Sequence, residues 1–178
     1  YDEWYTTYER IDSDVPPSEG GAYRLVKDYF DQSAGFFDQW DFDESEYTGG
    51  VVDYSSRDTA EDAGILNETR GDFARWGTDS TSFLDTWQGR KTVKLVGQET
   101  YNRGLFILDA AHMPTGCSTW PSWWMFGPDW PNQGEWDIVE GVHRQTEVDT
   151  TLHTSEGCDQ AYMVEDDEFT GEWNEGLF

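Results

Sequence analysis

Short strand-like runs separated by turn residues are the feature that most constrains the fold of this 178-residue chain. Aromatic and β-branched residues gather in these runs, and glycine, proline and acidic residues lie between them. No segment carries a sustained apolar period of 3.6 residues, so we expect no long amphipathic helix. The pattern favours an all-β sandwich or barrel. The expected strands are 23–30, 51–54, 91–95, 104–111, 135–142 and 148–153, with strand fragments at 65–66 and 83–84 and a brief helix at 59–63.

The domain organisation follows from a change in composition near residue 23. Residues 1–22 are polar and are punctuated by Pro16-Pro17 and Gly20-Gly21, which predicts an irregular or extended N-terminal arm. No internal repeat or low-complexity linker divides the remainder. We therefore expect a single domain over residues 23–178. The run 104–111 is almost continuously apolar, as in a strand that is buried on both faces.

The charge of the chain restricts its partners. Thirty-seven Asp and Glu residues against 11 Lys and Arg give a formal net charge of -26. Such a surface repels nucleic acid phosphates and anionic membranes, and the sequence holds no run of 18 apolar residues that could span a bilayer. We expect a monomer with no nucleic-acid or membrane partner. The start of the chain does not read as a signal peptide, so we expect a mature secreted protein or an excised piece.

Three carboxylates gather in the segment Gly134–Gly141. In a regular strand Glu135 and Asp137 point to one face, and Glu140 points to the other. One extra residue, a β-bulge around Ile138-Val139, would bring Glu140 back to the face of the other two acids. Ile138, Val139 and Val142 indicate that this strand also has a buried side.

Three neighbouring carboxylates cannot all stay ionised without cost, so the pKa of one of them rises. One proton donor and one anionic nucleophile are the pair that a retaining glycosidase uses, with carboxyl groups about 5–5.5 Å apart. Two other interpretations stay open from the residues alone. The acids could be part of a solvated surface, or they could bind calcium.

Five tryptophans surround these acids: Trp120, Trp123, Trp124, Trp130 and Trp136. An indole can stack on a sugar ring and donate its N–H to a hydroxyl, although tryptophan also simply fills protein cores. Nearby prolines and glycines predict that Trp123, Trp124 and Trp130 lie in loops, which favours a carbohydrate site. Cys117 and Cys158 could form one disulfide bond or pair elsewhere.

The central stretch resembles glycoside hydrolase family 16, and most closely its fungal-type endo-1,3(4)-β-glucanases, or laminarinases. The family motif is Glu-x-Asp-x-x-Glu in its bulged form, which Glu135, Asp137 and Glu140 fit. The resemblance covers roughly residues 23–158. The matching stretches are Tyr23–Leu25, Phe36–Trp40, Gly89–Val93, Ala111–Pro121, Trp124, Trp130–Val142 and Leu152–Thr154.

The resemblance implies a set of roles. Glu135 corresponds to the nucleophile, Glu140 to the general acid/base and Asp137 to the carboxylate that assists the nucleophile. No cofactor or catalytic metal is implied, and a structural calcium ion, which this fold can carry, is not assignable to residues here. The candidate substrate-binding residues are Trp124, Trp130, His153, Trp120 and Arg90.

The implied fold is a concanavalin-like β-jelly-roll sandwich with the acids on its concave face. The family domain continues well beyond the motif, whereas 38 residues follow Glu140 here, so we expect a sandwich truncated on its C-terminal side. The implied activity is that of a secreted, retaining endo-β-glucanase acting on β-1,3 or mixed β-1,3/1,4-glucan. The alternatives are a non-catalytic glucan-binding module and a cell-wall transglycosylase of the same family.

Overall fold

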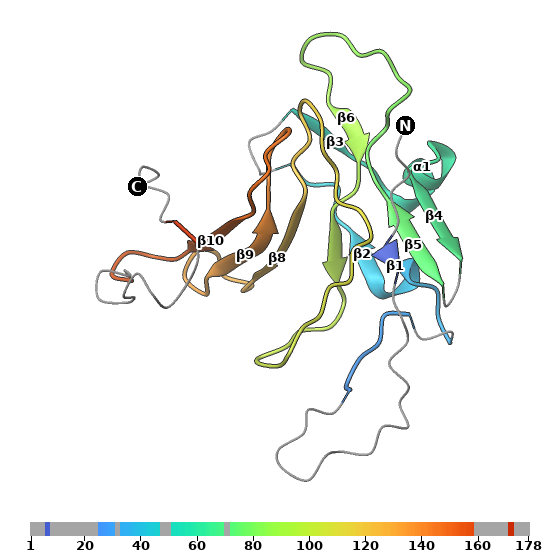
Figure 1. The fold of residues 1–178 in the computed structure, drawn as a ribbon. Helices are drawn as coiled ribbons and strands as arrows, with labels where there is room; N and C mark the ends of the chain where they lie inside the picture. The colour runs from blue at the N-terminus through green and yellow to red at the C-terminus, as the bar shows by residue number, and fades with distance from the viewer. Residues whose placement is uncertain are drawn as a thin grey trace. The chain divides into compact units, whose positions relative to one another are not determined.

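The computed structural model describes residues 6–7, 25–30, 33–46, 51–69, 72–158 and 171–172. Almost all regular structure in these residues is β-strand, as expected, and α1 is a helix of six residues. The elements are β1 (Thr6–Thr7), η1 (Phe37–Gln39), β2 (Trp40–Phe42), β3 (Val52–Tyr54), α1 (Arg57–Asp62), β4 (Leu66–Thr69), β5 (Phe73–Trp76), β6 (Arg90–Thr92), β7 (Leu95–Gly97), β8 (Ser122–Phe126), β9 (Glu135–Glu140) and β10 (Asp149–His153) (Figure 1).

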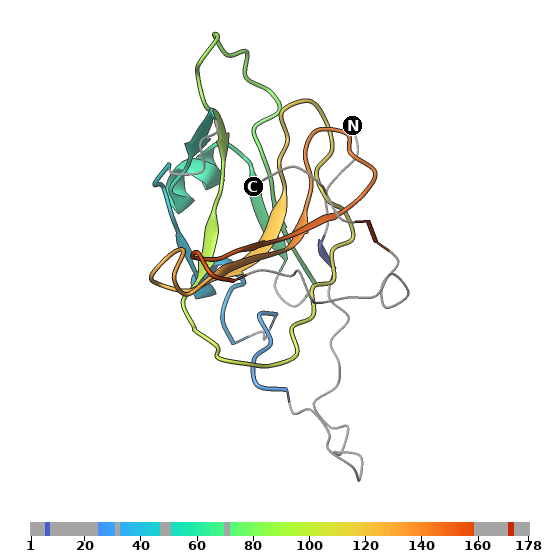
Figure 2. The ribbon, with the colours of Figure 1, turned by 90° about the vertical axis from the view of Figure 1, so that its left-hand side faces the viewer.

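The chain divides into two compact units, residues 1–114 and residues 115–178. In the first unit, β5 lies between β1 and β4 in an antiparallel sheet. Strand β2 pairs antiparallel with β7, and β3 pairs parallel with β6. The helix α1 lies beside β4, as Figure 2 also shows. It begins at Ser56, whose side chain caps the helix by accepting a hydrogen bond from the Thr59 amide.

Aromatic packing builds the core of the first unit. Phe36 is 4% exposed and Phe37 is 3% exposed, and together with the buried Ala74 of β5 they form one core cluster. The ring of Phe36 stacks on Trp76, with 5.4 Å between ring centroids and 17° between planes. The aromatic richness of the sequence therefore compensates for its modest aliphatic content. The half-buried residues that surround this centre are Tyr29, Phe30, Trp40, Phe42, Leu66, Trp76 and Leu95.

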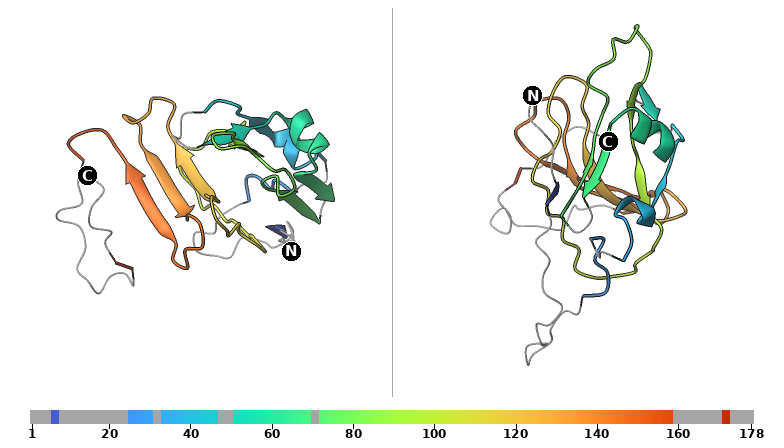
Figure 3. Two further views of the ribbon diagram at one scale, coloured as in Figure 1. Left: turned by 90° about the horizontal axis from the view of Figure 1, so that it is seen from above. Right: turned by 90° about the vertical axis from the view of Figure 1, so that its right-hand side faces the viewer.

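In its described residues, the second unit contains one antiparallel sheet of β8, β9 and β10, with β9 in the centre (Figure 3). The connection from β8 to β9 closes where the Gly127 amide donates to the Gly134 carbonyl at 3.0 Å. Gly134 has a φ of +78°, a left-handed conformation that glycine adopts without steric cost. A Cβ on Gly127 would lie 2.3 Å from the Cβ of Gln133, so no side chain fits there.

Several strand predictions are confirmed with shifted ends, since β3, β9 and β10 coincide with the runs 51–54, 135–142 and 148–153. The brief helix is α1, and the fragment 65–66 overlaps β4. The single strand predicted at 91–95 is two strands instead, β6 and β7, which pair with different partners.

Other strand predictions are wrong. Residues 25–30 and 83–84 contain no strand, and residues 23–24 lie outside the described residues. Residues 104–111 are also not a strand, and Leu105 and Ile107 are 59% and 61% exposed. Within the described residues this run pairs with no other strand, so its apolar character alone does not produce a buried strand.

The boundary predicted after residue 22 lies outside the described residues and stays a prediction. Thr6–Thr7, within the predicted arm, forms β1 and pairs with β5. Among the helices of the described segments, none has the length and apolar character needed to cross a membrane.

Candidate active site

A β-bulge in β9 brings the three acids of the motif to one face. On the β8 side, Trp123 lies opposite Val139 and Trp124 lies opposite Asp137, so Ile138 is the extra residue. On the β10 side, the register shifts over the same interval of β9. The bulge expected around Ile138 and Val139 is therefore confirmed. Because side chains alternate along a strand, the extra residue returns Glu140 to the face of Glu135 and Asp137.

Each acid on this face contacts a separate hydrogen-bonding side chain. The indole of Trp130 donates its Nε1–H to Oε2 of Glu135. The indole of Trp120 donates to Oε1 of Glu140 at 2.5 Å. Nε2 of His153 lies 3.1 Å from Oδ2 of Asp137. Trp120, Trp130 and His153 were all predicted as substrate contacts, and the structure brings them to the acids.

Asp137 is the buried member of the acid set, at 4% exposed. Burial is the largest cause that raises the pKa of Asp137, to about 6, and the negative charges of Glu140 and Glu135 add to it. The His153 side chain opposes this rise through its charge and hydrogen bond. The structure thus places a carboxyl that titrates near neutrality between two half-buried glutamates.

Two aromatic rings lie beside the acids on the same face. Trp124 is opposite Asp137 and Phe126 is opposite Glu135, and the two rings stack with centroids 4.8 Å apart. Phe126 is 44% exposed, so this pair offers an aromatic surface to solvent. Phe126 was not predicted as a site residue. Its only sequence signal is its place two residues after Trp124, on the same side of a strand.

Trp123 and Trp124 lie in β8 rather than in loops, which corrects the sequence-based prediction. Pro121 and Gly127 flank this strand instead of interrupting it. Trp130 does lie in the connection between β8 and β9, as expected. Val142, predicted to be buried, is 36% exposed because β9 ends at Glu140.

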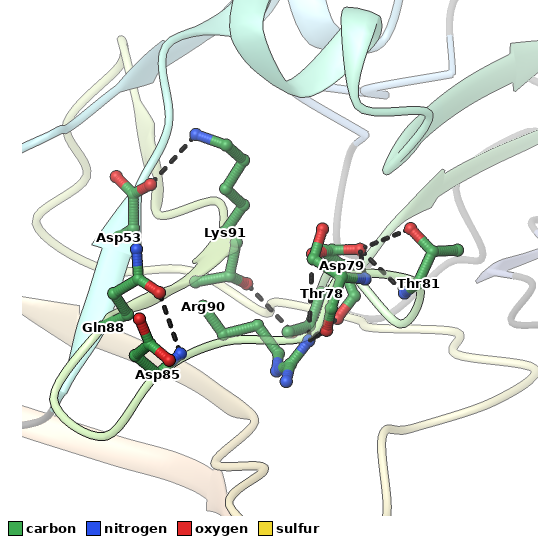
Figure 4. Close-up of polar contacts among 10 residues, drawn as sticks. Asp53, Thr78, Asp79, Thr81, Asp85, Gln88, Arg90 and Lys91 are labelled. Carbon is green, nitrogen blue, oxygen red and sulfur yellow. Dashed lines mark hydrogen bonds and ion pairs between the residues drawn. The ribbon is translucent and has the colours of Figure 1, made fainter.

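Arg90 lies in the first unit, on β6. Its guanidinium donates to the carbonyls of Asp79 and Ser82, both at 3.1 Å, and approaches the Asp79 carboxylate at 3.8 Å. Figure 4 shows Arg90 pointing toward the Asp79 turn, whereas Lys91 points toward Asp53. Hydrogen bonds from Ser82 and Thr81 hold the pKa of Asp79 below its usual range. Arg90 therefore holds a loop, and its contact with substrate stays a prediction.

The acid face also offers a group of potential metal ligands. One oxygen each of Glu135 and Asp137 and one ring nitrogen of His153 lie within 4.8 Å of one another. The sequence left calcium binding open for these acids, and Glu135 and Asp137 do offer two oxygens close together. The third member of the group is an imidazole, which calcium does not prefer as a ligand. Asp137 and His153 already contact each other directly, so these two side chains are paired without an ion.

The matching family model is that of the XgeA-like, catalytic GH16 domain, and it matches residues 37–174. The chain belongs to glycoside hydrolase family 16. The curated relatives of this GH16 chain include a probable glycosidase of Schizosaccharomyces pombe, 37% identical over 145 residues that make up 81% of this chain and 33% of the relative. The endo-1,3(4)-β-glucanase xgeA of Emericella nidulans is 40% identical over 120 residues, 66% of this chain and 19% of that protein.

Solved GH16 structures confirm the jelly-roll fold. A structure described as an elongating GH family 16 β-1,3-glucosyltransferase is 39% identical, with a TM-score of 0.62 over 66% of this chain. The laminarinase 16A of Phanerochaete chrysosporium, solved with β-glucans in its donor and acceptor sites, is 31% identical, with a TM-score of 0.54 over 67% of this chain. This GH16 chain covers 41% of each of those chains and a third or less of the curated relatives named above.

Proposed function

We propose that the protein is a retaining endo-β-glucanase that cleaves β-1,3 or mixed β-1,3/1,4-glucan. The observation that carries this proposal is the bulge in β9, because it gathers Glu135, Asp137 and Glu140 on one face. Retaining glycosidases hold their two carboxyl groups about 5–5.5 Å apart, which is within reach of side chains on one strand face. Membership of GH16 and the glucanase relatives support the substrate class.

The proposed reaction has two displacement steps. Glu135 attacks the anomeric carbon, the glycosidic C–O bond breaks, and Glu140 gives its proton to the departing oxygen. Water then gives a proton to Glu140 and attacks the same carbon, which releases Glu135. The buried Asp137 lies between the two in sequence and on the same face, and below a pH of about 6 its proton limits the repulsion among the three carboxyls.

The aromatic residues supply the proposed sugar contacts. Trp124 and Phe126 form a stacked pair next to Glu135, and Trp130 is 57% exposed while its N–H holds the same glutamate. Apolar ring faces of glucose pack on such surfaces, and hydroxyls reach the polar edges. A neutral polysaccharide also suits a chain with a net charge of -26. We further propose that the protein acts outside the cell as a monomer.

Hydrolysis of laminarin by the wild type and by Glu135→Gln tests the proposal. Removal of the nucleophile should lower kcat by at least about 10³-fold. Glu147→Gln is the matched control, because Glu147 is an exposed glutamate in the connection between β9 and β10. Activity of Glu135→Gln equal to that of Glu147→Gln would refute the assignment. Binding of laminarin without release of reducing ends would instead favour a glucan-binding module.

A transglycosylase is the second candidate, favoured by the 39% identity to an elongating β-1,3-glucosyltransferase. The same two carboxyls would act, and a sugar hydroxyl would replace water in the second step. Incubation of the protein with a fluorescent laminari-oligosaccharide and laminarin separates the two reactions. Longer labelled products indicate transfer, and only shorter ones indicate hydrolysis. EDTA should leave either activity unchanged, since neither reaction needs a metal.

A further inference from the structure

His143, a residue outside the acid motif, holds the segment that leads into β8. Its main-chain N–H donates to the Thr119 carbonyl at 2.9 Å. Its carbonyl accepts from the Gly116 amide at 2.8 Å and from the Thr115 hydroxyl at 3.3 Å, and it shares the Thr119 hydroxyl, 3.3 Å away, with the Gly116 carbonyl at 2.9 Å. The ring nitrogen Nδ1 accepts the Ser118 amide at 2.9 Å. His143 thus anchors this segment through both its backbone and its side chain.

The backbone on both sides of this contact adopts left-handed conformations. His143 has a φ of +57° and Ser118 a φ of +67°, which residues with a Cβ adopt at a steric cost. The cost is offset because these conformations aim the Ser118 amide at the imidazole and the His143 carbonyl at its three donors. Since Nδ1 accepts a hydrogen bond, the ring proton of the neutral imidazole is on Nε2.

The anchored segment ends in Trp120, the partner of Glu140. Trp120 is 60% exposed, so little side-chain packing fixes the position of its indole. What fixes it is the backbone that His143 holds, together with the 2.5 Å hydrogen bond to Oε1 of Glu140. A second backbone contact, from the Gly141 amide to the Pro121 carbonyl at 3.2 Å, joins the same two segments next to β8 and β9.

We propose that His143 is a positioning residue that acts on Glu140 through Ser118 and Trp120. By accepting the Ser118 amide, the imidazole fixes the turn before Trp120, and the indole then holds one oxygen of Glu140 in place. The other oxygen is left for proton transfer, and this catalytic meaning rests on the proposed function. Without the imidazole acceptor, Glu140 loses a defined orientation although the carboxyl itself is intact.

Three substitutions separate the acceptor from the backbone conformation. His143→Asn keeps a side-chain acceptor and tolerates a left-handed φ. His143→Gly relieves the backbone but removes the acceptor, and His143→Ala removes the acceptor and keeps the steric cost. The first readout is the indole N–H resonance of Trp120 in a ¹H–¹⁵N spectrum, assigned with Trp120→Phe. The second is the pair kcat and KM on laminarin, with a thermal melt to verify folding.

The Trp120 resonance should move in His143→Gly and His143→Ala and stay in place in His143→Asn. In the same two variants kcat should fall about tenfold, a fraction of the usual worth of general acid catalysis, with KM within about twofold. His143→Asn should keep kcat. Wild-type kcat and an unmoved resonance in His143→Gly would overturn the proposal, even if His143→Ala fails to fold. If the wild type does not act on laminarin, the proposed function fails, and the resonance alone still decides the role of His143.

Discussion

The imidazole of His153 contacts the buried carboxyl of Asp137, with 3.1 Å between Nε2 and Oδ2. In the register of β9 and β10, however, His153 lies opposite Glu135, and Thr151 lies opposite Asp137. The side chain therefore reaches diagonally across the ladder to the acid with the raised pKa. The charge and the hydrogen bond of His153 lower the pKa of Asp137, and its contact with sugar stays a prediction.

Replacement of His153 by alanine should raise the pKa of Asp137 further above about 6. The reason is that the hydrogen bond and charge of His153 are the two influences that lower it. Carbon-13 NMR titration of the aspartate carboxyls measures this change, with Asp137→Asn identifying the resonance. An unchanged or lower pKa in His153→Ala would contradict the role given to the contact.

Substitution of Asp137 by asparagine should stabilise the protein at pH 7 and weaken its activity. The native pKa of about 6 lies above the ordinary value of 3.8, so the native state holds the proton more tightly than the unfolded chain. Stability then falls as pH rises from about 4 to 6, and the ionised carboxyl costs about 2–3 kcal/mol at pH 7. Asparagine avoids this cost.

Urea unfolding at pH 4 and pH 7 checks this prediction. The free energy of unfolding of Asp137→Asn should exceed that of the wild type by about 2–3 kcal/mol at pH 7, and the difference should shrink to about 0.5 kcal/mol at pH 4. Glu147→Gln removes one exposed charge and controls for the general relief of a net charge of -26. An equal gain in both variants would mean that the burial of Asp137 has no special cost.

The indole N–H of Trp130 should contribute to activity separately from the aromatic surface of its ring. Trp130→Phe keeps an aromatic surface but leaves Glu135 without its donor. A hydrogen bond to a charged group contributes about 1.5–3 kcal/mol, so kcat/KM on laminarin should fall at least about tenfold. Trp136→Phe is the control, because this exposed indole lies on the opposite face of β9. Similar losses of kcat/KM in Trp130→Phe and Trp136→Phe would argue against a contribution of the Trp130–Glu135 hydrogen bond to activity.

Loss of the Phe36 ring should destabilise the first unit. The ring is 4% exposed and packs against Phe37 and Trp76, so Phe36→Ala should cost about 3–5 kcal/mol of unfolding free energy. Phe83→Ala deletes a fully exposed ring and should cost almost nothing. Guanidinium unfolding followed by tryptophan fluorescence compares the two. A cost under about 1 kcal/mol for Phe36→Ala would show that its packing is loose.

The acid constellation could be predicted because it depends on local spacing. Side chains alternate along a strand, so Glu135 and Asp137 share a face, and one bulge is the smallest change that adds Glu140. The bulge is indeed in the predicted place. The contribution of Phe126 could not be predicted in this way, because it depends on the register between two strands rather than on the sequence of either one.

The errors arise where the structure depends on contacts with other segments of the chain, which the local sequence does not show. Pro121 and Gly127 suggested a loop, but they lie just outside a five-residue strand and leave its hydrogen bonds intact. Residues 104–111 showed the opposite error, since an apolar run becomes a strand only when another strand pairs with it. His143 also gave no local signal, because its five hydrogen bonds all cross to residues 115–119.

The close contact at Gly127 has a consequence for any directed evolution of this site. With a Cβ there 2.3 Å from the Cβ of Gln133, every amino-acid change at this position forces the backbone apart. A substitution at Gly127 therefore shifts Gln133 and disturbs the closure of the β8–β9 connection, so this position offers a mutant library no useful variants. New substrate preferences are better sought by diversifying Asp129 and Asn132, exposed positions on either side of the Trp130–Pro131 pair.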